Sequence, residues 1–504
     1  MTPLTAVRAA KPSAPPIDVI LWFDTEDYLS PSDDDAAKRL AQLLSARQIR
    51  ATFKVVGEKA RVLEQRHRTD VIDALKRHDI GFHGNFHSVH PTVSEYEATA
   101  GLQDGMEEFV RREGVGAADV RRIFGRESLV CYGQPGSSFA AQAIAALRAC
   151  KIENDGVPCY LDSGQHVGVG GTPFWYAGAL VVYKMRPNET RMELFTPDGL
   201  EQGEKQFADI ARQLRGSGGG LISIFYHPCE WVTSEFWDGV NFSRGANPPR
   251  DQWKLPAQRP AEQTQAAFGR FEQYIDFIRE QPGVHFVTAS QLPAIYSDSL
   301  RTRGATINQI TELARRISAP DSPGLDDLTI QGMTFSPADQ LFLLASTLSI
   351  AKNPAGALTI APLSLLGPDS PPPNPDPEPI PVSWPAFTQA VLDLSDYIKS
   401  NQRIPSQIFI GSHRVSPADF TVALARAFLE SRDPAHLPTS VLPGKGVKVL
   451  TERFVAREDG RLFSGWVIHP TAFQAPHIMD IARLQAWTIK PAVRIAATPA
   501  PQNP

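Results

Sequence analysis

The sequence predicts an α/β fold with a parallel sheet or barrel, because apolar runs and amphipathic segments alternate over residues 17–295. The run "IDVILWFD" (17–24) is continuous, contains β-branched residues and ends at an acidic cluster, which is typical of a buried parallel strand. The next segment, "DDDAAKRLAQLLSARQI" (33–49), has the apolar spacing of a helix. Repetition of this pair favours helices packed against a parallel sheet.

The same alternation continues through the rest of this part of the chain. In such folds, functional residues gather at the carboxyl ends of the strands. Here those ends carry an acidic cluster after residue 23, two histidines at 83 and 87, the sequence "YGQPG" (132–136), and His227. Further strands are expected at 50–60, 79–83, 128–135, 220–228 and 284–290, and helices at 70–78, 93–113, 137–150 and 261–280.

The composition excludes several classes of protein. A chain of 504 residues and 55.2 kDa is too long for one ordinary core, so two or three domains are expected. The net charge of −5, the pI of about 6.2 and the lack of a long basic run argue against a nucleic-acid partner or an anionic membrane surface. No apolar run of about 18 residues predicts a membrane span. The four cysteines are too few for a disulfide framework, and the absence of a CxxC pair excludes a zinc ribbon.

The first 16 residues, "MTPLTAVRAAKPSAPP", are expected to form a flexible segment. They lack the apolar core of a signal peptide, so the sequence taken at face value predicts a cytoplasmic protein. A trimmed or misplaced start would hide an export signal, and the protein would then belong to the cell envelope or be secreted.

Residues 299–504 are expected to form a mainly α-helical accessory region. The proline-rich stretch 368–385 is expected to be an extended tether or surface loop between two similar units, about 306–350 and 386–432. Both units contain "SPAD" before an apolar helical pattern, in which Ser would cap the helix, Pro would take its first position and Asp would lie near the positive end of its dipole. An internal duplication explains the pair, and two independent uses of a common helix start are the alternative.

A metal site is indicated by "GFHGNFHSVHP" (81–91), which contains three of the 12 histidines of the chain. His83 and His87 have the i, i+4 spacing that lets two imidazoles face one ion, although His87 and His90 could also pair on a helix. The preceding strand ends in "WFDTEDY" (22–28). Burying its three acids is costly because like charges repel and burial disfavours ionisation, and a divalent cation would relieve that cost.

Five motifs in this order resemble those of the NodB-type polysaccharide deacetylases, carbohydrate esterase family 4. They are "LWFDTEDY", "ATFKVVGEKA", "HDIGFHGNFHS", "YGQPGSSF" and "ISIFYHP". The resemblance covers about residues 17–295 and implies a distorted (β/α) barrel of seven or eight strands over residues 17–298. It also implies a hydrolase acting on non-peptide C–N bonds with a divalent metal, Zn²⁺ first and Co²⁺, Ni²⁺ or Mn²⁺ as alternatives.

The resemblance also implies roles for individual residues. Asp24 matches the catalytic base and His227 the late histidine that protonates the leaving amine. His83 and His87 match the metal-binding histidines, and the metal carboxylate falls on Glu26 or Asp27, because "DTED" is spaced differently from the common pair of adjacent aspartates. The candidate substrate-binding residues are Tyr132, Gln134, Pro135, Gly136 and Trp231, the last as one of several tryptophans able to stack on a sugar.

Two departures from the family pattern bear on activity. The arginine of the Arg-x-Pro motif falls on Gly133, so the residue that usually orients and tunes the base is missing, and Gln134 cannot supply a positive charge. Gly84 replaces the Ser or Thr that normally follows the first metal histidine. Both changes favour a divergent member with an altered substrate, weakened activity or no catalysis.

The expected function is removal of N-acetyl groups from an amino-sugar polymer or related amide. The alternatives are a metal-dependent amidase on a small non-carbohydrate amide and a catalytically weakened cell-wall-binding protein. The C-terminal stretch "YIKSNQRIPSQIFIGSHRVSPADFTVALA" (397–425) is loosely similar to pseudomurein-binding-type repeats. That similarity implies that the accessory region binds a cell-wall polymer and raises the effective concentration of substrate. A helical domain that packs on the barrel or dimerises is the other interpretation.

Overall fold

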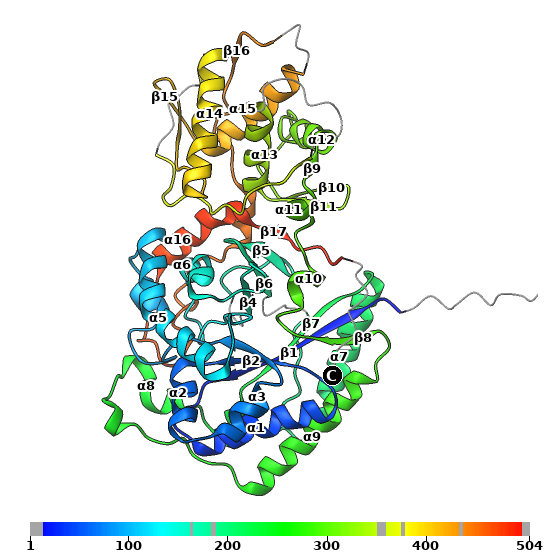
Figure 1. Ribbon diagram of the computed structural model, residues 1–504, viewed down its shortest axis with the longest axis vertical. Helices are drawn as coiled ribbons and strands as arrows, with labels where there is room; N and C mark the ends of the chain where they lie inside the picture. The colour runs from blue at the N-terminus through cyan, green and yellow to red at the C-terminus, as the bar shows by residue number, and fades with distance from the viewer. Residues whose placement is uncertain are drawn as a thin grey trace, which may run out of the picture.

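The chain folds into two lobes joined by its C-terminal segment (Figure 1). The computed structural model describes residues 14–161, 165–182, 188–349, 359–373, 379–432 and 437–495. Most of the predicted flexible segment 1–16, and part of the proline-rich stretch, lie outside these ranges. Within them, no helix is both long enough and apolar enough to cross a membrane.

A parallel sheet forms the centre of the larger lobe. Its middle strand, β1 (Ile17–Thr25), pairs with β7 (Gly220–Tyr226) along one edge. Along the other edge it pairs first with β8 (Val284–Val287) and then with β2 (Thr52–Val55), which in turn pairs with β3 (Asp79–Phe82). Every residue of β1 is buried, which explains why the strand is mostly apolar.

The sheet continues beyond β3 through single bridges made by Tyr132 to Phe82 and Tyr160. Three short strands follow in the order β4 (Cys159–Leu161), β6 (Ala179–Val182) and β5 (Phe174–Tyr176). The predicted α/β class with a parallel sheet is confirmed. Among the described residues the paired strands do not close into a ring, so the barrel of seven or eight strands stays a prediction.

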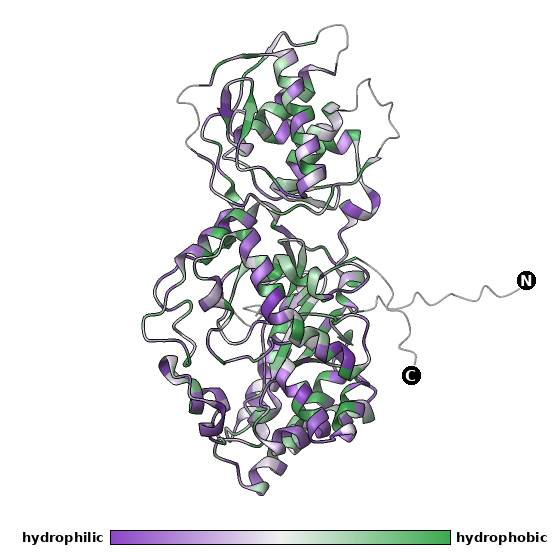
Figure 2. Ribbon diagram, turned by 60° about the vertical axis from the view of Figure 1, so that its left-hand side comes forward, coloured by the Kyte–Doolittle hydropathy of each residue, from purple (hydrophilic) through white to green (hydrophobic). Residues whose placement is uncertain are grey.

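Helices surround this sheet, and Figure 2 shows the apolar strands inside a shell of helices with mixed polar and apolar faces. The longest, α5 (Leu102–Phe124), ends at Gly125, which takes the left-handed conformation (φ 61°) that glycine adopts without strain. The others are α1 (Pro31–Ala46), α2 (Gly57–Gln65), α3 (Thr69–Leu75), α4 (Val93–Glu97), α6 (Ala141–Ala146), α7 (Gly199–Gly216), α8 (Trp237–Phe242), α9 (Ala261–Arg279), α10 (Leu292–Ile295) and α11 (Ser299–Arg303), with 3-10 turns η1 (Leu147–Cys150), η2 (Pro228–Trp231), η3 (Ser243–Gly245) and η4 (Arg250–Gln252).

Several predicted elements differ in extent from those observed; the helix expected at 137–150, for example, begins only at Ala141 and ends in the 3-10 turn η1. The single helix expected at 93–113 is two helices, α4 and α5, because the chain turns at Gly101 before α5 begins. The strand expected at 50–60 is only β2, after which α2 starts at Gly57. The strand expected at 128–135 is reduced to isolated bridges at Leu129 and Tyr132.

The smaller lobe contains two units with the same order of elements, helix, short β-hairpin and helix. The helices agree with the predicted α-helical character, but the hairpins were not expected, because three-residue strands give too little alternation to recognise. The duplication itself stays a prediction. The first unit comprises α12 (Ile307–Ile317), β10 (Leu328–Ile330), β11 (Met333–Phe335) and α13 (Pro337–Ser349), and the second α14 (Trp384–Asn401), β14 (Ile408–Ile410), β15 (His413–Val415) and α15 (Pro417–Glu430). Two-residue strands pair β9 (Ala305–Thr306) with β12 (Thr359–Ile360) and β13 (Val382–Ser383) with β16 (Ser440–Val441).

Both "SPAD" sequences cap their helices in the same way. The hydroxyl oxygen of Ser336 accepts the backbone N–H of Asp339 at 3.2 Å, and that of Ser416 accepts the N–H of Asp419 at 3.0 Å. The two aspartates have different further partners. Asp339 forms an ion pair with the buried Lys490 at 2.9 Å, whereas Asp419 accepts the backbone N–H of Val447.

The C-terminal segment returns to the larger lobe after the second unit. Its turn η5 (Leu450–Phe454), helix α16 (Pro476–Gln485), turn η6 (Ala486–Thr488) and strand β17 (Lys490–Pro491) follow in order, and β17 pairs with β5 (Figure 1, red). Most buried apolar side chains from 455–489 belong to the core of the larger lobe, whereas those of 300–441, together with Trp487, form a core of the smaller one. The sequence assigned 299–504 to one accessory region, but its last part packs as a component of the larger lobe.

We expect Lys490→Met to destabilise the protein by about 3–5 kcal/mol, because it leaves Asp298 and Asp339 buried without the ammonium that lies 2.7 and 2.9 Å from them. Urea-induced unfolding followed by fluorescence measures the change. Lys399→Met is the matched control, since Lys399 pairs with Asp396 on the exposed surface, and it should leave the free energy of unfolding unchanged. Equal stability of the two variants would contradict this role for Lys490.

Candidate metal centre

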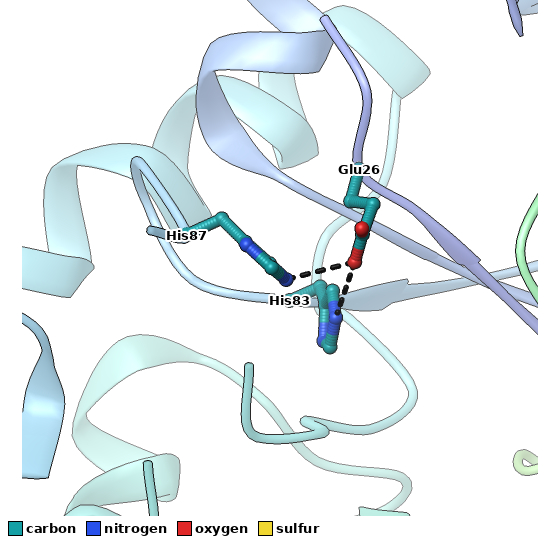
Figure 3. A group of neighbouring side chains, drawn as sticks. All are labelled: Glu26, His83 and His87. Atoms are coloured by element: carbon teal, nitrogen blue, oxygen red, sulfur yellow. Dashed lines mark ion pairs between the residues drawn. The ribbon is translucent and has the colours of Figure 1, made fainter. Parts of the chain in front are cut away.

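Three side chains converge where β1 and β3 end. Glu26 directly follows β1, His83 directly follows β3, and His87 lies four residues further along the same loop (Figure 3). The Nε2 atoms of His87 and His83 lie 2.8 and 3.6 Å from Oε2 of Glu26. One ligand atom from each residue lies within 4.8 Å of the other two, and all three residues are buried. The predicted histidine pair and one predicted carboxylate therefore form a single cluster.

Hydrogen bonds on the far side of each imidazole direct its Nε2 toward Glu26. Nδ1 of His83 donates to the carbonyl oxygen of Gly133 at 2.8 Å. Nδ1 of His87 lies 2.5 Å from the hydroxyl of Ser88, which donates to Asp238 at 3.4 Å. Such outer contacts fix the tautomer and orientation of metal-binding histidines.

The chemistry of this donor set fits a divalent metal. Two imidazoles and a carboxylate are the ligands of catalytic zinc sites, which leave a further position for water. Nε2 of His87 is buried and faces the Glu26 carboxylate 2.8 Å away. The His87 backbone is also left-handed (φ 59°), an unfavourable conformation for a residue with a side chain, and one that brings its imidazole to Glu26. A cation would satisfy these groups at once.

Asp27, the other predicted metal carboxylate, faces elsewhere. Its Oδ1 accepts the backbone N–H groups of Leu29 and Ser30 at 2.8 and 3.1 Å, just before α1 begins. Because side chains alternate along an extended chain, Asp24 and Glu26 share a face and Asp27 does not. The cluster therefore contains Glu26 and excludes Asp27.

The predicted catalytic pair, Asp24 and His227, lies against this cluster. The two oxygens of Asp24 lie 3.7 Å from Nε2 of His83 and 3.6 Å from Nε2 of His227. His227 follows β7, the neighbour of β1, and its Nδ1 lies 2.8 Å from Glu230. Arg191 in turn lies 2.5 Å from Glu230. The pairing of β1 with β7 therefore places the Asp24 carboxylate and the His227 imidazole beside the metal cluster.

Burial and charge set the protonation of these groups. Burial acts to raise the pKa of Asp24, but His83, Lys54 and His227 lower it below its ordinary value. Burial would lower the pKa of His227, but Glu230, Glu26 and Asp24 raise it to about 9. The site therefore favours an ionised Asp24 beside a protonated His227, which is the arrangement of a general base and a general acid.

Lys54, which the sequence analysis did not single out, is the nearest cation to Asp24. It lies within β2, and its Nζ is 2.8 Å from Oδ1 of Asp24. Its one sequence signal is a charged residue inside the apolar strand "ATFKVV", where a buried lysine requires a partner.

Two of the predicted substrate-binding residues of "YGQPG", Tyr132 and Gln134, are buried. Tyr132 is buried and contacts the rings of Phe82 and Tyr160. The amide of Gln134 is fixed by Tyr160 and by the carbonyl oxygen of Gly136, so it stiffens the loop from within. A Cβ on Gly84 would lie 3.2 Å from the Pro135 ring, which places that ring against the histidine loop.

The predicted substrate contact at Trp231 is corrected. Its indole is fully buried against Tyr226, Phe268 and Phe271, on η2 beneath α9, and presents no face to a ligand. Trp175 and Trp237, two other tryptophans of this lobe, are also buried. His90 lies apart from the metal cluster and pairs with Glu95 at 2.7 Å.

Trp466 borders the site on the side of His87, and it comes from the returning C-terminal segment. Its ring lies against Gly136, where a Cβ would be only 2.2 Å away, and 5.5 Å from the ring of His87. Its Nε1 donates to Asp238 at 3.1 Å. A cleft of about 590 Å³ opens beside it, with Gly136, Ser137, His166, Asp459 and Arg461 in its lining.

Comparisons with known proteins add little to this geometry. No family model and no curated protein matches the chain. A protein described as a polysaccharide deacetylase from Mycobacterium smegmatis is 16% identical over 57% of this chain and 92% of that one, with a TM-score of 0.34. The allantoinase PuuE is 13% identical over 56% and 92% (TM-score 0.34), and the peptidoglycan deacetylase PdaC from Bacillus subtilis is 14% identical over 55% and 89% (TM-score 0.26). Such low TM-scores carry no argument, so the function has to be inferred from the site itself.

We expect the purified protein to bind about one Zn²⁺ per chain and His83→Ala/His87→Ala to bind none at the same concentrations, because two of three ligands are gone. Metal content after gel filtration measures this. His90→Ala is the matched control and should retain the ion, since His90 pairs with Glu95 outside the cluster. Unchanged metal content in the double variant would contradict the assignment.

The same measurement separates the two acids. Glu26→Gln should weaken zinc affinity by about 100-fold or more, whereas Asp27→Asn should leave it nearly unchanged, because Asp27 accepts backbone N–H groups instead. The reverse order would assign the metal to Asp27.

Proposed function

We propose that this protein is a metal-dependent hydrolase of non-peptide amide bonds that removes N-acetyl groups from an amino-sugar polymer or a related amide. The observation that supports it is the position of Asp24 between the two halves of the site. One oxygen of Asp24 lies 3.7 Å from His83 of the metal cluster, and the other lies 3.6 Å from His227. Metal-assisted hydrolysis of an amide uses these three functions, a metal, a base and an acid, side by side.

A divalent ion held by Glu26, His83 and His87 would polarise the amide carbonyl and make water acidic enough to lose a proton near neutral pH. Asp24, ionised and buried, accepts the proton of the attacking water. His227 donates a proton from Nε2 to the departing nitrogen as the C–N bond breaks. The products are acetate and a free amine, and the proton from water balances the one given to nitrogen.

Glu230 and Arg191 prepare His227 for this role. Glu230 binds Nδ1 of His227 at 2.8 Å, which leaves Nε2 directed toward Asp24 and raises the pKa of the imidazole. Arg191 lies 2.5 Å from the other oxygen of Glu230. Burial alone would raise the pKa of Glu230, but His227 and Arg191 lower it to about 2, so Glu230 stays an anion.

A small non-carbohydrate amide is the second candidate substrate, and Trp466 favours it. The indole covers Gly136 and approaches His87, so it narrows the site on the side of the "YGQPG" loop. A polymer would have to enter past it, through the adjoining cleft. Binding of a cell-wall polymer by the smaller lobe, with little or no catalysis in the larger one, is the third proposal.

We expect the zinc-loaded protein to release acetate from N-acetylated chito-oligosaccharides, and Asp24→Asn to reduce kcat by at least about 100-fold, because the amide cannot accept the proton of water. Acetate is measured enzymatically, and a panel of cyclic and acyl amides is assayed in parallel to separate the two substrate classes. Asp27→Asn serves as the matched control and should retain activity. Equal rates for the native protein and Asp24→Asn, or polymer binding without turnover of any amide, would refute the hydrolase.

The pH dependence of kcat/KM should reflect the protonation of His227. Activity needs its protonated form, so kcat/KM should fall as the pH rises through about 9, the pKa that Glu230 and the neighbouring carboxylates give it. Glu230→Gln removes a negative charge and should move this alkaline limb to lower pH. Glu235→Gln, on the same loop but exposed, should not move it. An alkaline limb at the same pH in Glu230→Gln would contradict the assignment of His227 as the acid.

A further inference from the structure

Lys54 occupies a position built for an ammonium group. It is 1% exposed, and the register of the sheet places it between Asp24 of β1 and Gly81 of β3 in one row across three strands. Its Nζ lies 2.8 Å from Asp24, 3.2 Å from the carbonyl oxygen of Leu161, and 3.9 Å from the centre of the Trp22 ring. A carboxylate, a carbonyl and an aromatic face are the groups that stabilise a buried cation.

Two glycines make room for this lysine. A Cβ on Gly133 would lie 2.0 Å from Nζ of Lys54 and 2.4 Å from the carbonyl oxygen of Leu161. A Cβ on Gly81 would lie 3.1 Å from Cγ of Lys54 and 2.5 Å from the sulfur of Cys131. Any side chain at position 133 would therefore displace the ammonium, so Lys54 and Gly133 depend on one another.

We propose that Lys54 is a positioning residue for the reaction: its ammonium holds the Asp24 carboxylate against the metal cluster and supplies the positive charge that Gly133 cannot. This inference rests on the proposed function, because it assigns a purpose to the carboxylate that acts as the base. The charge comes from β2, one strand away from the "YGQP" segment in which the motif would place it. The glycine at position 133 leaves the space that the Lys54 ammonium occupies beside Asp24.

The charge of Lys54 should affect catalysis and metal binding in opposite directions, whereas its packing would affect both in the same direction. The ammonium attracts Asp24, but it also repels a cation bound by the neighbouring cluster, since one oxygen of Asp24 lies 3.7 Å from Nε2 of His83. Removing the charge at constant size should therefore weaken catalysis and strengthen metal binding. General loosening of the site would weaken both.

The test uses the full-length, zinc-loaded protein and the variant Lys54→Met, which keeps an unbranched side chain, one atom shorter, and replaces the ammonium over the Trp22 ring by an uncharged methyl group. We expect kcat to fall about 100-fold with KM nearly unchanged, as when one preorganised charge is removed from an active site. Zinc affinity, measured by competition with a chromophoric chelator, should rise. A kcat within about twofold of native, or parallel losses of kcat, zinc affinity and melting temperature, would overturn the proposal.

Chemical rescue tests the charge separately from the shape. Lys54→Ala lacks the atoms of propylammonium, so adding that ion should raise kcat of this variant by at least about 10-fold, whereas 1-propanol, of similar shape without the charge, should not. Equal effects of the two additives, or of neither, would show that the charge is not what the site requires and would overturn the proposal.

A crystal structure of Lys54→Met separates this inference from the proposed function. We expect the Asp24 carboxylate to rotate away from His83 and His227, whether or not an amide substrate has been found. An unmoved Asp24 would overturn the positioning role even in an active enzyme. A native protein that hydrolyses no amide would instead refute the proposed function, while a displaced Asp24 would still assign its orientation to Lys54.

Discussion

The rest of the structure depends on the complete burial of β1, because this strand ends in carboxylates that have to be compensated inside the protein. Asp24 receives the ammonium of Lys54, and Glu26 receives the imidazoles of His83 and His87. Each compensating group comes from the strand beside β1 or the one beyond it, or from the loop that follows. Two buried carboxylates at the same sheet edge are therefore compensated in different ways, Asp24 by an ammonium and Glu26 by two imidazoles.

The acidic residues that follow in the first turn of α1 are compensated by a lysine. Lys59 on α2 forms buried ion pairs with Asp33 and Asp34 at 2.5 and 2.6 Å, and it also donates to the backbone oxygen of Asp27. These acids gain a fixed protein cation, whereas Glu26 meets only imidazoles among the groups within ion-pair distance in the described chain. That contrast explains why a run of acids in the sequence "DTEDYLSPSDDD" corresponds to one candidate metal ligand.

The features that could be predicted from the sequence are those that depend on local residue patterns. The alternation of strands and helices, the convergence of Asp24, His83, His87 and His227, and the capping by "SPAD" all follow from local periodicity and from the rule that parallel strands end at one edge. Trp231 was misjudged because exposure of an aromatic ring depends on distant neighbours, here on α9. Lys54 and Trp466 were missed for a related reason, since the first needs the pairing register and the second joins the site from more than 300 residues away.

The return of the C-terminal segment has a consequence for how the protein is made. On the ribosome, the parallel sheet emerges first and the smaller lobe next, while Trp466, α16 and β17 emerge only after both. Until then β5 pairs only with β6 and lacks its second neighbouring strand, and the cleft beside Gly136 lacks one wall. A nascent chain therefore contains Glu26, His83 and His87 before it contains Trp466 and the cleft residues Asp459 and Arg461, so the two parts of this region are synthesised in two stages separated by a whole lobe.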